Sequence, residues 1–242
     1  MKRGRVSLPR ALWRRARKGA TALFSSCFPG RWKKMSELAY WRSRKKLEGE
    51  LTGDHYKFFF TDHFGLSDEF YDGKVILDIG CGPRGSLEWA TMAARRIGLD
   101  PLAKEYLWLG AGRHRMEYVS GHAERIPLAD GSCDAVFSFN SLDHVDDVRG
   151  AMSEIKRVTR PGGCFLLLVE VNHAPTATEP HRLEPASLIQ LLETEFRCIQ
   201  ARLYRPTGEG MYDAVREGHE IDAGEWNSAP GYLSAKFIRD PG

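Results

Sequence analysis

Short apolar runs alternate with amphipathic stretches along the chain from Lys74 onward. A run of four to eight apolar residues bounded by turn residues predicts a buried strand, and apolar positions spaced three and four apart predict a helix. Strands that alternate with helices are typical of a parallel sheet. The predicted strands are 74–80, 96–100, 116–123, 133–140, 163–170, 197–205 and 232–240, and the predicted helices are 86–95, 148–160 and 186–196.

The helix boundaries and the last connection complete the predicted fold. Ser86 is placed to cap the helix at 86–95, and Pro161 with the two glycines after it is placed to stop the helix at 148–160. The stretch 208–231 is polar and rich in glycine, so the last two strands can pair antiparallel. We therefore expect an α/β fold with a Rossmann-like, doubly wound, seven-stranded sheet, mostly parallel, with a C-terminal antiparallel hairpin and N-terminal helices.

The 242 residues suffice for one α/β domain with its own core. Five cysteines are scattered singly, without a CxxC pair, which favours a reducing compartment and argues against structural zinc. No run approaches the roughly 20 apolar residues of a membrane-spanning helix. We expect a cytoplasmic protein whose main domain covers 35–242, with 35–72 as a helical cap.

Positive charge is concentrated at the start of the chain. Residues 1–34 hold eleven Lys and Arg and no acidic residue, so the rest carries 24 basic against 32 acidic groups. This basic tail, interleaved with aromatic residues, is either disordered, or associated with an anionic membrane surface, or a targeting segment. An acidic main domain argues against nucleic acid as a partner.

The segment LDIGCGPRGS places Gly80, Gly82 and Gly85 directly after a predicted strand. This context indicates a loop that approaches a ligand closely and leads into a helix. Asp100 ends the next strand, where a carboxylate can accept hydrogen bonds from ribose hydroxyls. Asp78 repels a pyrophosphate but can face a cationic amino-acid group, so it favours S-adenosylmethionine (SAM) over NAD.

Four motifs occur in an order that resembles a known family. They are VILDIGCGPRG, then GLDP, then GHAERIPLADGSCDAVFSFNSLDHV, then EIKRVTRPGGCFLLLVE. Together, over 73–171, they are similar to class I SAM-dependent methyltransferases of the type 11 group, which includes ubiquinone and menaquinone biosynthesis enzymes. The resemblance implies SAM as cofactor and S-adenosylhomocysteine as its product.

The resemblance also implies which residues contact SAM. Asp78 and the glycine loop would surround its methionine part, Asp100 its ribose, the AERIP turn its adenine ring, and Asn140 its amino group. Relatives often have Gly-Asp-Ala where this chain has Gly121, His122 and Ala123, so a contact with the adenine amino group is missing or replaced. The cofactor residues implied are Asp78, Gly80, Cys81, Gly82, Gly85, Asp100, Pro101, Ala123, Glu124 and Asn140.

Titratable residues follow the fourth and fifth predicted strands, whose carboxyl ends border the ligand crevice of such a sheet. Methyl transfer to a hydroxyl needs an aligned acceptor and a base. The ordinary pKa of histidine suits proton uptake near neutral pH, so His144 is a candidate for that base. The alternative is that His144 is a structural histidine. The catalytic candidates are His144, Glu170 and His173, and the substrate-binding candidates are Tyr56, Asp143, Glu179 and His181.

The chemistry of the acceptor is narrowed by what these segments contain. His173, Glu179 and His181 have no strong metal-ligand spacing, so we expect no metal. The fourth strand ends in FSFNSL and lacks the Asn/Asp-Pro-Pro-Tyr signature of base-modifying enzymes. We expect methyl transfer to a small molecule, most readily a hydroxyl oxygen of a metabolite, saccharide or natural-product intermediate; the alternatives are a non-catalytic SAM-binding protein and an NAD-dependent oxidoreductase.

Overall fold

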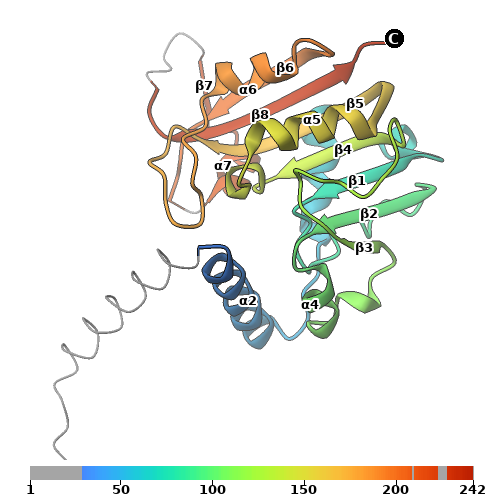
Figure 1. Ribbon diagram of the computed structural model, residues 1–242, viewed down its shortest axis with the longest axis vertical. Helices are drawn as coiled ribbons and strands as arrows, with labels where there is room; N and C mark the ends of the chain where they lie inside the picture. The colour runs from blue at the N-terminus through green and yellow to red at the C-terminus, as the bar shows by residue number, and fades with distance from the viewer. Residues whose placement is uncertain (1–28, 209, 223–227, 242) are drawn as a thin grey trace, which may run out of the picture.

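The computed structural model describes residues 29–208, 210–222 and 228–241, which are built around one twisted sheet (Figure 1). Strands β1 to β5 run parallel to one another, and β8 runs antiparallel between β5 and β6. The order across the sheet is β3-β2-β1-β4-β5-β8-β6-β7. The strands are β1 (Val75–Ile79), β2 (Arg95–Asp100), β3 (Glu117–Ser120), β4 (Cys133–Phe139), β5 (Thr159–Val171), β6 (Phe196–Tyr204), β7 (Glu220–Ile221) and β8 (Gly231–Arg239).

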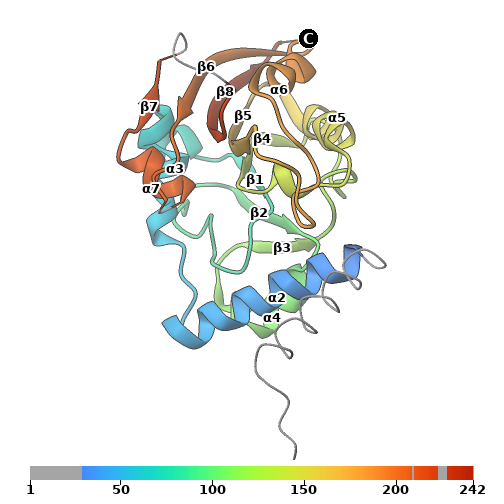
Figure 2. The same cartoon turned by 90° about the vertical axis from the view of Figure 1, so that its left-hand side faces the viewer.

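The helices cover both faces of the sheet. Figure 2 shows α5 and α6 on one side, α3 and α7 on the other, and α2 beside α4 near β3. Two apolar clusters fill the spaces between the sheet and these layers, and β4 and much of β5 are accordingly buried on both faces. The α-helices are α2 (Pro29–Glu48), α3 (Lys57–Phe60), α4 (Ala103–Trp108), α5 (Val148–Val158), α6 (Pro185–Leu192) and α7 (Met211–Arg216), and the 3₁₀ turns are η1 (Asp54–Tyr56), η2 (Asp62–Phe64), η3 (Asp68–Tyr71), η4 (Ala111–Arg113) and η5 (Leu142–His144).

The strand order reverses between β1 and β4, because β2 follows on one side of β1 and β4 lies on the other. In open α/β sheets the ligand crevice lies beyond the carboxyl ends of the strands at this point. The loops after β1, β2, β4 and β5 are therefore the ones that border the crevice.

The α/β fold and its antiparallel C-terminal pair are confirmed. β6 and β8 pair directly. The polar connection between them contains the short helix α7 and the two-residue strand β7, so the sheet has eight strands where seven were predicted. Helix α5 ends at Val158, and β5 begins at Thr159, before the Pro-Gly-Gly stop.

The predicted helix at 86–95 is wrong. Residues 83–89 form successive turns, and Arg95 already belongs to β2. The hydroxyl of Ser86 donates to Asp78 and caps no helix. The Trp89 ring packs at 5.1 Å from the Tyr71 ring, so tertiary contacts of this segment outweigh its helical propensity.

The N-terminal region forms helices before the sheet, but α2 starts at Pro29 and crosses the expected boundary between 34 and 35. The prediction that the basic tail is disordered or lies on a membrane surface falls mostly on 1–28, outside the described residues. Among the helices that the structure describes, none has the length and apolar character needed to cross a membrane.

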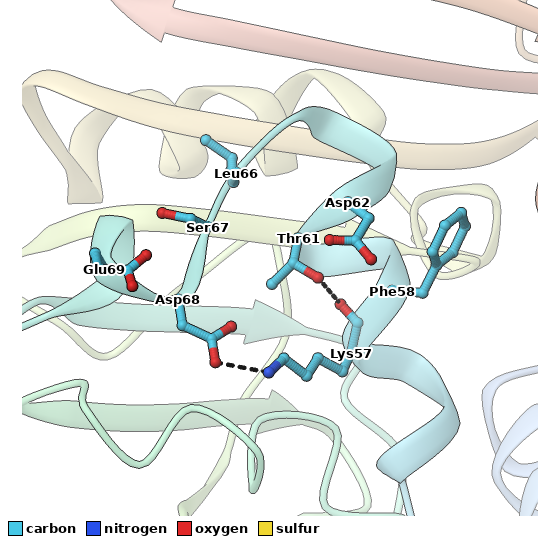
Figure 3. Close-up of a pocket in the computed structure, with 8 residues that line it drawn as sticks. All are labelled: Lys57, Phe58, Thr61, Asp62, Leu66, Ser67, Asp68 and Glu69. Atoms are coloured by element: carbon cyan, nitrogen blue, oxygen red, sulfur yellow. Dashed lines mark hydrogen bonds and ion pairs between the residues drawn. The ribbon is translucent and has the colours of Figure 1, made fainter.

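A surface hollow lies within this N-terminal region, between α3 and η3 (Figure 3). Lys57 Nζ and Asp68 Oδ2 are 2.7 Å apart across it, and Thr61 Oγ1 donates to the carbonyl of Lys57. None of the predicted site residues lines this hollow. The functional candidates gather instead around the carboxyl ends of the parallel strands.

Candidate functional site

The loop after β1 requires glycine for two reasons. Gly80 has a φ of +74°, in the left-handed region that L residues avoid. A Cβ on Gly80 would also lie 2.2 Å from the Cβ of Ser141, which follows β4. The loop after β1 and the loop after β4 are thus in direct contact across the point where the strand order reverses.

Asp100 ends β2 beneath this loop and is buried. Its Oδ1 accepts a hydrogen bond from Leu102 N at 2.8 Å, and its Oδ2 accepts a longer one from Gly82 N at 3.3 Å. Burial raises the pKa of Asp100 to about 6. The carboxylate is fixed by backbone donors and keeps lone pairs that can accept the hydroxyls of a ribose.

Asp78 is a second buried carboxyl on the adjacent strand β1. Burial, together with the nearby charge of Asp100, raises the pKa of Asp78 to about 7, although Ser86 donates a hydrogen bond to it. No cationic side chain is among the causes of the pKa shifts of these two neighbouring buried acids. A positively charged ligand group would stabilise both ionised forms, as a sulfonium or ammonium does.

Helix α2 covers the glycine loop, and sequence reasoning did not identify the residues that hold it there. Arg84 in the loop forms an ion pair with Glu48 at 2.7 Å, and its guanidinium lies 5.4 Å from the centre of the Trp41 ring. A Cβ on Gly82 would lie 3.2 Å from Trp41 Cζ2. The sequence predicts a helical cap over 35–72 but has no signal for these individual contacts.

Some other residues expected at the cofactor lie at the crevice, and one turns away from it. Asn140 directly follows β4, is exposed and has a φ of +54°, and Pro101 directly follows Asp100. The buried side chain of Cys81 points at the sheet, because a Cβ on Gly98 would lie 2.6 Å from Cys81 Sγ. Cys81 therefore offers the crevice its backbone.

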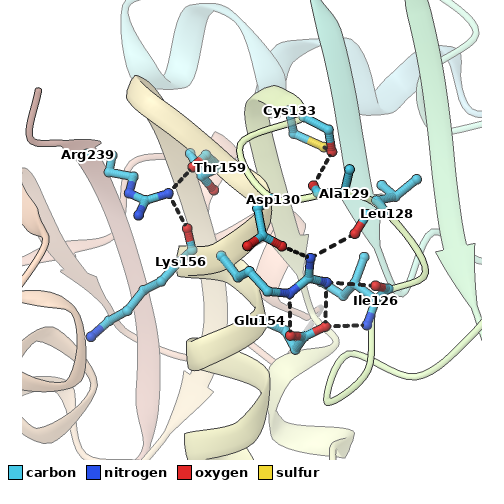
Figure 4. A network of polar contacts seen from close by, with 11 residues as sticks. Ile126, Leu128, Ala129, Asp130, Cys133, Glu154, Lys156, Thr159 and Arg239 are labelled. Carbon is cyan, nitrogen blue, oxygen red and sulfur yellow. Dashed lines mark hydrogen bonds and ion pairs between the residues drawn. The ribbon is translucent and has the colours of Figure 1, made fainter. Parts of the chain in front are cut away.

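The AERIP turn is held against α5 by a polar network (Figure 4). The guanidinium of Arg157 contacts Glu154 and Asp130 and donates to the carbonyls of Ile126 and Leu128. These contacts position the turn that contains Ala123, which is buried, and Glu124.

Glu124 has a local structural partner. Its Oε1 accepts hydrogen bonds from the backbone N of Asp146 and of Asp147, at 2.7 and 3.1 Å. The side chain of Glu124 thus binds the segment that leads into α5, and any contact with adenine would come from the backbone of the turn or its remaining carboxylate oxygen.

Across from the cofactor residues, three acceptor-side candidates come together. One ligand-type atom from each of Asp143, His144 and Glu179 lies within 4.8 Å of the others. The side chain of Asp143 is 1% exposed, and neither of its carboxylate oxygens has a hydrogen-bond partner. Burial raises the pKa of Asp143, while the adjacent His144 lowers it.

Glu170 and His173 border the same group. Burial raises the pKa of Glu170, and the charges of Asp143 and Glu179 raise it further. His173 Nδ1 lies 3.0 Å from the carbonyl oxygen of Ala174, which can only accept, so this nitrogen carries the proton. His173 Nε2 is buried without a partner and has a free lone pair.

Two further candidates have different surroundings. Tyr56 packs its ring 5.1 Å from that of Tyr212, and burial raises its pKa to about 12. His181 Nε2 is 3.1 Å from the carbonyl of Asp146 and is not part of the group formed by Asp143, His144 and Glu179.

Tyr212 was not identified from the sequence, since it lies in the polar stretch before β8. Besides Tyr56, its ring contacts that of Phe59, at 4.8 Å. After burial, the charges of Tyr56, Asp78 and Asp143 raise its pKa further. Tyr212 therefore lies within electrostatic reach of both the cofactor-side and the acceptor-side carboxylates.

Comparison with known proteins agrees with this geometry. Residues 77–167 match the family model described as a methyltransferase domain. A probable S-adenosylmethionine-dependent methyltransferase of Mycolicibacterium smegmatis is 33% identical over 162 residues, which are 62% of this chain and 63% of that protein. The malonyl-[acyl-carrier protein] O-methyltransferase of Yersinia pestis is 38% identical over 40% of this chain and 36% of its own length. The matched part thus spans less than two thirds of these relatives.

Solved structures share the fold at low sequence identity. An S-adenosylmethionine-dependent methyltransferase from Mesorhizobium loti has a TM-score of 0.53 at 20% identity, covering 70% of this chain and 92% of that one. Geranyl diphosphate C-methyltransferase from Streptomyces coelicolor, solved with Mg²⁺, geranyl diphosphate and S-adenosyl-L-homocysteine, has a TM-score of 0.53 at 16% identity, covering 76% and 77%. These likenesses support the Rossmann-like architecture.

Proposed function

We propose that this chain, which has a methyltransferase domain of the class I SAM-dependent family, transfers a methyl group from SAM to a hydroxyl oxygen of a small-molecule acceptor. The observation that carries this proposal is the occurrence of two polar sets at the carboxyl ends of the same parallel strands. Buried carboxyls suited to a cationic nucleoside lie under the glycine loop, and imidazole and carboxylate groups with free lone pairs lie across from them.

The residues of the cofactor side fit SAM in charge and shape. Asp100 would accept the ribose hydroxyls, and Asp78 would face the methionine end, whose positive charge favours ionisation of a carboxyl with a pKa near 7. Asp78, directly before the glycine loop, would repel the pyrophosphate of NAD, whereas Asp100 would suit the ribose of either cofactor. When bound, SAM supplies an electrophilic methyl group on a sulfonium.

The acceptor side supplies a base for the hydroxyl proton. His173 fits this task, because its Nδ1 is occupied by a backbone carbonyl while its buried Nε2 is free to accept a proton. Glu179 Oε2 lies 4.0 Å from His173 Nδ1 and would stabilise the imidazolium formed. A surface with this many acceptors suits a polyhydroxylated molecule better than an apolar one.

A methyl-transfer assay tests the proposal. The protein is incubated with SAM labelled at the methyl group and a panel of polyols, sugars, phenols and matched amines. We expect label in base-stable methyl ethers of hydroxylated compounds. Label only in the amines would overturn O-methylation, and binding of SAM without transfer to any member would favour a non-catalytic SAM-binding protein.

A further inference from the structure

Asp143 and His144 have bonding capacity that the methyl-transfer proposal leaves unused, and Glu179 lies beside them. Asp143 and His144 belong to η5, which follows β4, and Glu179 belongs to the loop that follows β5. The fold brings them together from positions 35 residues apart. We propose that these three side chains bind a divalent transition-metal cation on the acceptor side of the crevice.

Asp143 provides the first argument. An ionised carboxylate that is buried without hydrogen bonds is costly, and proteins normally pair such a group or use it to coordinate a metal. Neither oxygen of Asp143 has a hydrogen-bond partner at 1% exposure, and the ionisable group within 4 Å of it is His144, whose Nε2 lies 3.8 Å from Oδ2. The neighbouring charges that shift its pKa come from His144 and His173, which lower it, and Glu179, which raises it.

The tautomer of His144 provides the second argument. Its Nδ1 lies 3.2 Å from the carbonyl oxygen of Thr178, which can only accept, so Nδ1 carries the proton. In the neutral ring the lone pair of Nε2 then faces Asp143 Oδ2 at 3.8 Å. A proton or a metal cation between the two lone pairs removes their repulsion, and a metal cation does so while the ring stays neutral. Metal-binding histidines commonly donate their second N–H to a backbone carbonyl, as His144 does.

The spacing and charge of the group also suit a metal. Ligand atoms about 2.1 Å from a metal lie no more than about 4.2 Å apart, so three atoms within 4.8 Å of one another need only a small contraction. Two carboxylates with a neutral imidazole carry two negative charges, which a divalent cation balances. This mixed oxygen and nitrogen set suits Mn²⁺ or Zn²⁺.

Three protein ligands leave coordination positions for the substrate. If the proposed O-methylation holds, on which this role depends, the acceptor hydroxyl binds there and the cation lowers its pKa. The hydroxyl proton passes to His173 Nε2, the oxygen forms its bond to the methyl carbon, and the carbon–sulfur bond breaks with its electron pair going to sulfur. The acceptor class is then a molecule with two adjacent oxygens, which can chelate the cation.

A titration of tag-free protein with Mn²⁺ tests the site. Electron paramagnetic resonance measures the concentration of the free ion and hence the amount that is bound. The variants are Asp143→Asn and Glu179→Gln, with Glu184→Gln and His219→Gln as matched controls, since Glu184 and His219 are exposed and outside the group. We expect one Mn²⁺ per chain in the wild type and both controls, and at least a tenfold weaker affinity in the two site variants.

Binding of S-adenosylhomocysteine is measured on the same samples, so that a failure of the cofactor site is seen separately. Asp143→Asn removes an unpaired buried charge and should fold at least as well as the wild type. Absence of Mn²⁺ binding, or equal binding by site variants and controls, would overturn the metal site even where S-adenosylhomocysteine binds all five proteins.

Discussion

The two sides of the crevice differ in how far the protein satisfies its own polar groups. On the cofactor side, Asp100 is hydrogen-bonded by two backbone N–H groups and Asp78 by a hydroxyl. On the acceptor side, both oxygens of Asp143 and Nε2 of His173 are buried without partners. The proposed cofactor side is thus satisfied by the protein itself, whereas the proposed acceptor side leaves polar groups open to a ligand, and the two should respond differently to substitution.

The largest effect is expected on the acceptor side, in the rate. His173→Gln keeps a polar side chain but removes the basic nitrogen, and loss of a general base lowers kcat by about 10² to 10⁴. Affinity for S-adenosylhomocysteine should change less than twofold, because His173 touches none of the cofactor residues described above. Steady-state kinetics and calorimetry check this with His219→Gln as control. An equal loss of kcat in His173→Gln and His219→Gln would mean that His173 is not the general base.

The next effect is expected on the cofactor side, in binding. Gly80→Ala forces an L residue to a φ of +74° and places a Cβ 2.2 Å from that of Ser141. We expect affinity for S-adenosylhomocysteine to fall by about 100-fold as the loop shifts. Gly73→Ala is the matched control, because its φ of +65° carries the same strain but no atom lies within 4 Å of the added Cβ. Similar losses in both would mean that backbone strain alone is responsible.

Asp78→Asn should separate stability from binding. The folded pKa of about 7 lies above the ordinary value of 3.8, so between these pH values the folded state binds more protons than the unfolded state. The free energy of unfolding of the wild type therefore falls as pH rises from about 4 to about 7. At pH 8 the variant should be more stable by on the order of 2 kcal/mol, and bind SAM more weakly.

Thermal unfolding of the ligand-free proteins from pH 4 to pH 8 measures this effect. The gain of Asp78→Asn should become small toward pH 4, which approaches the unfolded-state pKa of 3.8 and lies well below the folded-state pKa of about 7. Asp72→Asn, at an exposed position, should show no such trend. A variant that is less stable than the wild type at pH 8 would contradict the assignment of Asp78 as an unbalanced buried acid.

The smallest effect is expected at the AERIP turn. Arg157→Lys removes the planar donor set that joins Glu154, Asp130 and two backbone carbonyls. At a side chain that is 30% exposed, the loss should be about 1 kcal/mol of stability, with a fewfold lower affinity for SAM. Denaturant unfolding compares it with Arg149→Lys at an exposed position on the same helix, where no change is expected.

The cofactor side could be predicted because its signals are local. A glycine loop directly after one strand and an acid at the end of the next are fixed by the sheet itself, and the structure places Gly80 and Asp100 accordingly. The contacts of α2 with the loop, such as Arg84 with Glu48, join residues 36 positions apart and have no pattern in the sequence. The helix expected at 86–95 failed because packing of Trp89 decides that segment.

The acceptor side could be predicted only residue by residue. Asp143, His144 and Glu179 were each candidates, but their grouping depends on the path of the loop after β5. His181, two positions beyond Glu179, shows this, because it points at the backbone of Asp146 and lies outside the group. Tyr212 was missed because α7 lies in a stretch whose composition predicts only a loop.

The central claim is that this chain binds SAM, with Asp100 holding its ribose. Calorimetric titration with S-adenosylhomocysteine and with NAD, carried out on the wild type and on Asp100→Ala, tests it most directly. The account predicts micromolar binding of S-adenosylhomocysteine by the wild type, at least a hundredfold weaker binding by the variant, and no binding of NAD. Binding of NAD, or binding of S-adenosylhomocysteine that is unchanged in Asp100→Ala, would contradict it.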